Sequence, residues 1–245
     1  MSSTIDRAPE RMRRQPPARG SAGLIQKGLL ACGVFVPLYY AAINVVAALR
    51  FKGYSSISQT ISELSAIGAP TRPLWLRMGI VYELLVIAFG VGVWMSADGK
   101  RALRVVGGVL VATGVIGFAW PPMHLRGAGT SLTDTMHIVF TAVTVLPTLI
   151  AIRLGATAFG KRFRIYSIAT IAISIVFGGL TGIQAPRVPK NLPTPWLGVW
   201  ERISIAAWML WIAVLAVALL RARREQAQAG LAGRPDSSLA VRPAA

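Results

Sequence analysis

The 22 residues from Gly28 to Leu49, GLLACGVFVPLYYAAINVVAAL, contain no charged side chain. A membrane-spanning helix needs about 20 mostly apolar residues, whereas the apolar region of a signal peptide covers about 7–15 and precedes a small-residue cleavage site. This stretch is too long for a cleaved signal and therefore predicts a helix that stays in the membrane. Pro37 lies inside it, and membrane helices tolerate proline because neighbouring helices satisfy the freed carbonyl.

Five further apolar stretches of similar length predict, with the first, an all-α membrane protein of six transmembrane helices. They lie at about Leu74–Met95, Ala102–Trp120, Thr135–Leu154, Ile165–Ile183 and Val199–Leu220. We expect one transmembrane domain over residues 28–220 and disordered tails at 1–27 and 221–245, because the basic tails lack apolar periodicity. Only 14% of the 245 residues are charged and Cys32 has no second cysteine to pair with, which excludes a soluble enzyme and a disulfide-stapled secreted module.

The formal net charge of +17 comes from Lys and Arg residues that flank the apolar stretches. A nucleic-acid binder gathers such residues on one folded face, so we expect no nucleic-acid partner. In membrane proteins they mark the cytoplasmic side and attract anionic lipid headgroups. The two tails and the connections around 97–101 and 155–164 hold 18 of the 26 basic residues. This distribution predicts a multi-pass plasma-membrane protein with both termini in the cytoplasm, embedded in the bilayer and touching anionic headgroups at its basic loops.

The first outer loop, residues 53–70, predicts a short amphipathic helix on the membrane surface. Its apolar residues recur at helical spacing, namely Ile57, Ile61, Leu64 and Ile67. The helix either seals the end of the bundle or turns Ser62 and Glu63 into a cavity between the spans. Both interpretations stay open.

The second outer loop contains both histidines of the chain, His124 and His137, together with Arg126 and Asp134. Asp134 and His137 are three residues apart at a helix start and so share a face. With His124 they could bind zinc, since a catalytic zinc takes three protein ligands and a water. Alternatively, Asp134 caps its helix and His137 simply hydrogen-bonds to it, because Asp is an ordinary partner of a helix N-terminus.

Three more charged residues stand out near or within the spans. Glu201 and Arg202 begin the sixth span, where Glu favours the helix dipole and Arg can reach headgroups. Glu83 lies nine residues into the second span, and a lone charge at such depth costs about 2.5–3.5 kcal/mol on insertion scales. It must be paired, protonated or exposed to a water-filled cavity. We expect a pair with Arg126 or Arg202.

Several short motifs in these loops resemble a known family. They are Ser56-Ile57-Ser58 through Ile61-Ser62-Glu63-Leu64, then Pro122-Met123-His124-Leu125-Arg126 with Asp134 and His137, and finally Gly198 with Glu201-Arg202. Together they resemble the bacterial and archaeal membrane family called domain of unknown function 998, over about residues 28–220. The resemblance implies a six-span membrane protein and supplies no activity or catalytic residues. The serine-rich first loop is more weakly similar to the Frag/DRAM/Sfk group of eukaryotic membrane proteins.

These observations leave three hypotheses of function, because no nucleotide-binding, zinc-protease or serine-hydrolase motif occurs in the chain. The first is a protein that binds or organises a lipid or membrane partner. The second is a metal-assisted hydrolase of a lipid-linked substrate, with zinc on His124, Asp134 and His137 and with Glu63 or Glu83 as general base. The third is a proton-coupled transporter that uses Glu83. The candidate polar cluster comprises Ser62, Glu63, Glu83, His124, Arg126, Asp134, His137, Glu201 and Arg202.

Overall fold

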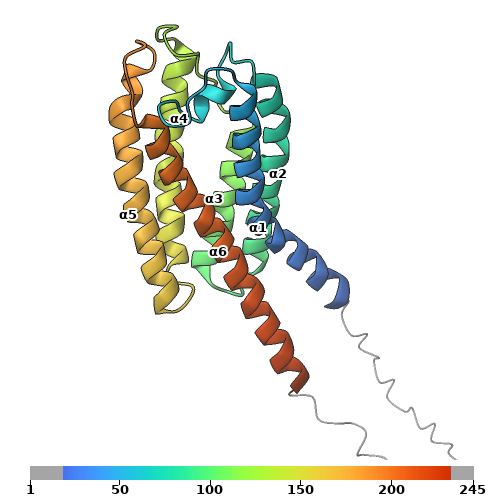
Figure 1. The fold of residues 1–245 in the computed structure, drawn as a ribbon. Helices are drawn as coiled ribbons and strands as arrows, with labels where there is room; N and C mark the ends of the chain where they lie inside the picture. Colours follow the sequence, from blue (N-terminus) through green and yellow to red (C-terminus); the bar gives the residue numbers. More distant parts are fainter. Residues whose placement is uncertain (1–18, 233–245) are drawn as a thin grey trace, which may run out of the picture.

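The computed structural model describes residues 19–232, which form six α-helices and two short 3₁₀ helices (Figure 1). The elements in chain order are α1 (Arg19–Arg50), η1 (Ser62–Ser65), α2 (Arg72–Met95), α3 (Arg101–Gly117), α4 (Leu132–Gly155), α5 (Lys161–Gln184), η2 (Ala185–Arg187) and α6 (Leu197–Ala232). Over this part of the chain there is no β-strand, and one isolated bridge joins Ile67 to His124. The expected all-α class is confirmed.

The six helices form a closed ring. Each helix contacts the next one along the chain, and α6 contacts α1. Successive helices run in opposite directions, so with six of them α1 begins and α6 ends at the same end of the bundle, which we call the tail end (Figure 1). The longer connections lie together at the opposite end, which we call the loop end.

Five of the helices, α1, α2, α4, α5 and α6, are long and apolar enough to cross a membrane. The third helix has 17 residues and is therefore about 25 Å long, slightly less than the hydrocarbon thickness of about 30 Å. Large apolar side chains face outward on the bundle; Leu49, for example, is 81% exposed. Such extensive apolar exposure is characteristic of a surface that contacts lipid, and these features fit an integral membrane protein.

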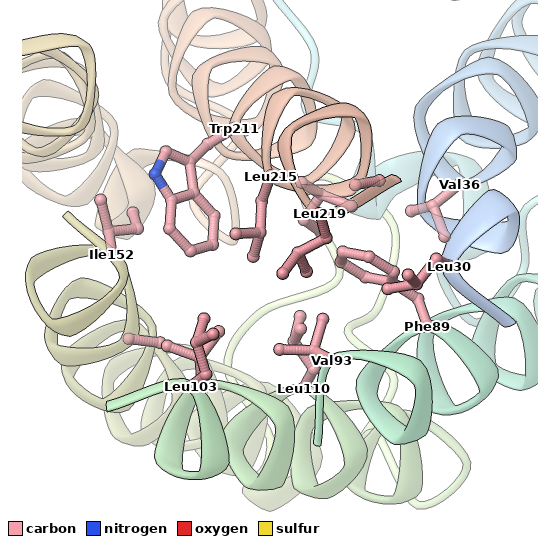
Figure 2. Close-up of a cluster of buried hydrophobic side chains, with 14 of the residues drawn as sticks. Leu30, Val36, Phe89, Val93, Leu103, Leu110, Ile152, Trp211, Leu215 and Leu219 are labelled. Atoms are coloured by element: carbon pink, nitrogen blue, oxygen red, sulfur yellow. The ribbon is translucent and has the colours of Figure 1, made fainter. Parts of the chain in front are cut away.

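A compact apolar core fills the tail-end half of the bundle (Figure 2). Trp211 and Leu215 of α6 are fully buried opposite Phe89 of α2 and Leu110 of α3. The Trp211 indole N–H donates to the Ser167 hydroxyl at 2.9 Å, so the one polar atom of this large side chain is satisfied inside the core.

The helices α2 and α3 approach each other closely through glycines. A Cβ on Gly107 would lie 2.7 Å from the carbonyl oxygen of Gly90 and 2.7 Å from the amide nitrogen of Trp94. Small residues allow membrane helices to pack backbone against backbone. The tight α2–α3 contact therefore depends on the absence of a side chain at Gly107.

The helices extend into both of the expected tails. Residues 19–27 belong to α1 and residues 221–232 belong to α6, so these parts of the tails are helical, whereas 1–18 and 233–245 lie outside the described residues. The continuation of α6 has a physical basis, because Ala, Arg, Glu and Gln dominate it and all are good helix formers. At the start of α1, the Gln26 side chain donates to Ser96 at 2.8 Å and ties the helix to the bundle.

The amphipathic helix expected in the first outer loop does not form. Residues 53–70 fold mainly as turns, with the four-residue helix η1 in the middle. Glu63 and Leu64 are completely buried there, so the segment turns inward rather than lying flat on a membrane surface. Backbone groups that would bond within a surface helix bond instead to distant side chains, as the Ile61 amide does to Glu201.

Candidate functional site

Three connections meet at the loop end and form what we call the loop cap, residues 51–71, 118–131 and 185–196 (Figure 1). Backbone hydrogen bonds join them. The Ile67 amide donates to the Met123 carbonyl at 2.7 Å, and the Gly127 amide donates to the Val188 carbonyl at 3.2 Å. Backbone bonds alone therefore hold the second connection to both the first and the third.

A buried ion pair lies at the centre of the loop cap. The Nε and Nη2 atoms of Arg126 donate to the two carboxylate oxygens of Glu63 at 3.1 and 3.2 Å. The side chain of Glu63 is 0% exposed and that of Arg126 is 18% exposed. Such a two-pronged geometry is the strongest that Arg and a carboxylate can form, so the pair holds the first connection against the second.

The same two side chains also bind the backbone around them. Arg126 donates to the carbonyls of Ser58 and Leu192, each at 3.2 Å. Glu63 accepts the Thr60 amide at 2.8 Å and the Thr60 hydroxyl at 3.1 Å. Arg126 thus reaches all three connections, and the buried carboxylate has the additional hydrogen bonds that a desolvated charge requires.

Arg202, at the start of α6, fastens the first connection to the bundle. Its Nη1 donates to the carbonyl of Ser56 at 2.8 Å and to that of Gln59 at 3.0 Å, and its Nη2 donates to the Tyr54 hydroxyl at 2.5 Å. Burial raises the pKa of Tyr54 to about 12, so the phenol stays protonated and donates to the Thr60 carbonyl at 2.7 Å.

Glu201 takes part in the same attachment, since its carboxylate accepts the amide of Ile61. Gly198 allows the close approach. A Cβ at this position would collide with the carbonyl oxygens of Gln59 and Ser56, so only glycine lets the first connection lie against the beginning of α6. Glu201 and Arg202 are therefore structural partners of the loop cap.

Asp134 caps helix α4 and also holds His124. Its carboxylate accepts the Ser131 amide and hydroxyl at 2.9 and 2.7 Å, which completes a capping box. The same carboxylate accepts the His124 amide at 2.6 Å and lies 3.1 Å from His124 Nδ1. The alternative in which Asp134 acts as a helix cap agrees with this geometry, although its imidazole partner is His124 rather than His137.

His137 lies one turn further along α4 and faces a different set of groups. Its Nε2 is 3.2 Å from the Ser62 hydroxyl, and its Nδ1 is 2.8 Å from the Pro121 carbonyl and 3.1 Å from the indole nitrogen of Trp120. The Trp120 indole can only donate, so its contact favours a lone pair on Nδ1, whereas the Pro121 carbonyl can only accept and favours a proton there. The ring therefore has a partner for either tautomer. Its Nε2 faces Ser62, whose hydroxyl also lies beside Glu201.

Glu83 does not pair with an arginine, so the expected pairing was wrong. Arg126 is bound to Glu63, and Arg202 is bound to carbonyls and Tyr54. Glu83 packs against α3, where its carboxyl group contacts Gly117, and over residues 19–232 it has neither an ion-pair partner nor a hydrogen-bond donor. The two arginines are used in the loop cap, above the level of Glu83.

A family model described as "Protein of unknown function (DUF998)" matches residues 30–218. The chain belongs to this family. The match runs from α1 to α6 and confirms the resemblance seen in the loop motifs. No curated protein and no solved structure matches the chain.

In this DUF998 chain the three candidate zinc ligands do not converge. His124 and Asp134 meet, but both ring nitrogens of His137 face Ser62, Pro121 and Trp120. Within the described part of the chain, no three His, Cys, Asp or Glu side chains are grouped so that they could hold a metal ion. Zinc binding by all three stays a prediction that requires His137 to leave its present contacts.

Several residues of the DUF998 site were missed by sequence reasoning. Ser131 could have been found, since it stands three residues before Asp134 in the pattern of a capping box. Trp120 was not among the candidates, although its indole N–H donates to His137. Tyr54 and Thr60 gave no signal, because a phenol or hydroxyl in a loop becomes meaningful only when its distant partner is known.

Proposed function

We propose that this protein is a six-span plasma-membrane protein with both termini in the cytoplasm, and that it binds a lipid within the loop-end half of the bundle. The distribution of Lys and Arg along the chain supports this orientation. The apolar core occupies the other half of the bundle. The loop cap covers the proposed site. Its charged side chains bond to one another and to backbone groups.

The observation that carries the proposal is Glu83, a carboxyl group in an apolar helix with no partner in the described chain. It is the twelfth residue of α2, about 16 Å along the helix from its first residue. The side chain is half-buried, and a carboxyl group at such depth without a hydrogen bond is unfavourable. A ligand that donates a hydrogen bond to Glu83 would remove this cost, and at this depth the donor is a lipid hydroxyl or amide N–H.

A matched pair of lipids tests the binding proposal. We expect the purified protein to bind a diacylglycerol, which has a free hydroxyl, about tenfold more tightly than its O-methyl ether, since leaving a desolvated polar group without a hydrogen bond costs about 1–3 kcal/mol. Native mass spectrometry of both lipids gives the ratio. The Glu83→Ala variant should lose the preference, and Glu225→Ala, an acid of the α6 extension, should keep it. Equal binding of the two lipids by the wild-type protein would contradict the proposal.

The contact between Ser62 and His137 favours a second candidate function, hydrolysis of a lipid-linked ester without a metal. A nucleophile within hydrogen-bond reach of a base, with the base oriented by a third group, is the arrangement of covalent catalysis. Ser62 Oγ would attack the ester carbonyl while His137 Nε2 takes its proton and then returns it to the departing alcohol. The step requires the tautomer with the proton on Nδ1, which the Pro121 carbonyl would accept, and the Trp120 indole N–H would have to turn away from that nitrogen. Water would release the acyl group in a second step.

Labelling with a long-chain fluorophosphonate tests this second candidate. We expect one covalent adduct per chain, located at Ser62 by peptide mass spectrometry, and a loss of labelling of about 100-fold or more in His137→Gln, as general-base contributions reach about 10²–10⁴. Ser65→Ala is the matched control, because Ser65 lies in the same 3₁₀ helix and only donates to the Ser62 carbonyl. Labelling of Ser62 that is unaffected by His137→Gln would exclude the activated hydroxyl.

A further inference from the structure

A cavity of about 260 Å³ opens at the tail end, far from the loop cap. Its walls come from α1, from the connection between α2 and α3 with the adjoining helix ends, from Phe159 in the connection between α4 and α5, and from the last part of α6. The polar residues among them include Gln26, Ser96, Asp98, Lys100 and Arg223. A volume of this size is slightly below that of a typical small-molecule site. It accommodates a small polar group and a few neighbouring atoms of the molecule that carries this group.

Arg223 is the decisive residue of the cavity. Its Nη1 atom is buried and has no hydrogen-bond partner over residues 19–232. A guanidinium group carries five donors in a fixed planar fork and cannot lose its charge. A buried donor of this kind without an acceptor is costly, and an anion in the cavity would supply the missing acceptor.

Other residues of the cavity wall also favour a negatively charged ligand. Lys100 is exposed and stands just before the first residue of α3, where the free amides and the helix dipole favour negative charge. Gln26 is 8% exposed and is held in place by its bond to Ser96. Asp98 is exposed and forms no ion pair in this part of the chain. The lining therefore has two cations and one anion, and its buried donor points to a ligand of negative charge.

We propose that this cavity binds a phosphate-type anion, held by Arg223 and Lys100. Arg forms parallel hydrogen bonds to two phosphate oxygens, and Lys adds a point charge. The phosphate group can belong to an anionic lipid headgroup or to a free phosphate in solution. The site is separate from Glu83 and from Ser62, so it does not depend on the function proposed above.

Two neighbouring arginines provide a matched test. Arg221 and Arg224 lie on the same turns of α6 as Arg223, but both are exposed and neither lines the cavity. Full-length protein in nanodiscs or detergent would be titrated with phosphatidylglycerol and, separately, with inorganic phosphate, with phosphatidylcholine as the uncharged comparison. Native mass spectrometry counts bound lipid, and calorimetry measures bound phosphate.

We expect Arg223→Gln to weaken binding at least tenfold, and Arg221→Gln and Arg224→Gln to change it less than twofold. Saturable binding of phosphatidylglycerol alone identifies a lipid headgroup as the source, and binding of inorganic phosphate identifies a free anion. Equal losses in all three variants would show only general attraction to a basic surface, and absence of binding by both anions would overturn the site.

Discussion

The Arg126→Gln variant is expected to lose about 3–5 kcal/mol of unfolding free energy, the usual cost of removing one partner of a buried ion pair. The fully buried Glu63 carboxylate would keep its bonds to Thr60 but would lose its counter-charge. The loop cap would also lose the bonds from Arg126 to the carbonyls of Ser58 and Leu192. Titration with SDS in mixed micelles, followed by tryptophan fluorescence, measures the change.

Two comparisons make this result specific. Arg187→Gln removes an exposed arginine of the same loop cap and should change stability by less than about 0.5 kcal/mol. The double variant Glu63→Gln/Arg126→Gln should be about 1–3 kcal/mol more stable than the sum of the two single losses predicts, because the second substitution removes the unpaired charge. Strictly additive losses would refute a direct pair between the two side chains.

The Gly107→Ala variant is expected to destabilise the α2–α3 pair by about 1–3 kcal/mol, as overpacked sites generally do. The added methyl group would lie 2.7 Å from backbone atoms of Gly90 and Trp94. Backbone in a helix cannot rotate away, so the two helices would have to separate. The measurement is again SDS titration, with circular dichroism as the signal.

Gly108 is the natural control for this second prediction. A methyl group there would meet only the outer ring of the Trp94 side chain at 3.1 Å, and that side chain is 53% exposed and free to move. Gly108→Ala should therefore be neutral or should stabilise the helix by up to about 1 kcal/mol, the difference in helix propensity. Similar effects of the two substitutions would contradict the idea that Gly107 permits backbone contact.

The helices could be predicted from the sequence because each is marked by a long apolar stretch with few charges. The expected span starting at Leu74 begins at Arg72, and the one ending at Leu154 ends at Gly155. Helix ends beyond the apolar stretches were not predictable in this way. The residues of α6 after Leu220 include three Arg, one Glu and two Gln among alanines. They continue the helix because of their high helix propensity, which a hydropathy pattern does not report.

The site was predictable in its residue types but not in its pairing. The sequence pointed to Glu63, Arg126 and Glu83 but assigned Arg126 to the wrong acid. Glu63 and Arg126 are 63 positions apart, and only the crossing of two loops brings them together. The helical spacing in residues 57–67 misled for the same reason, since distant groups such as Glu201 take backbone amides that local periodicity reserves for a helix.

The attachment of the first connection to α6 sets an order of events during synthesis. The Ile61 amide finds its acceptor on Glu201, 140 positions later in the chain, and Arg202 comes just after it. At about 5–20 residues per second, the ribosome needs on the order of ten seconds to make that partner. Until then the connection between α1 and α2 lacks the α6 side chains that bond to its backbone groups. We therefore expect a chain truncated before α6 to be degraded faster in the cell than the full-length protein.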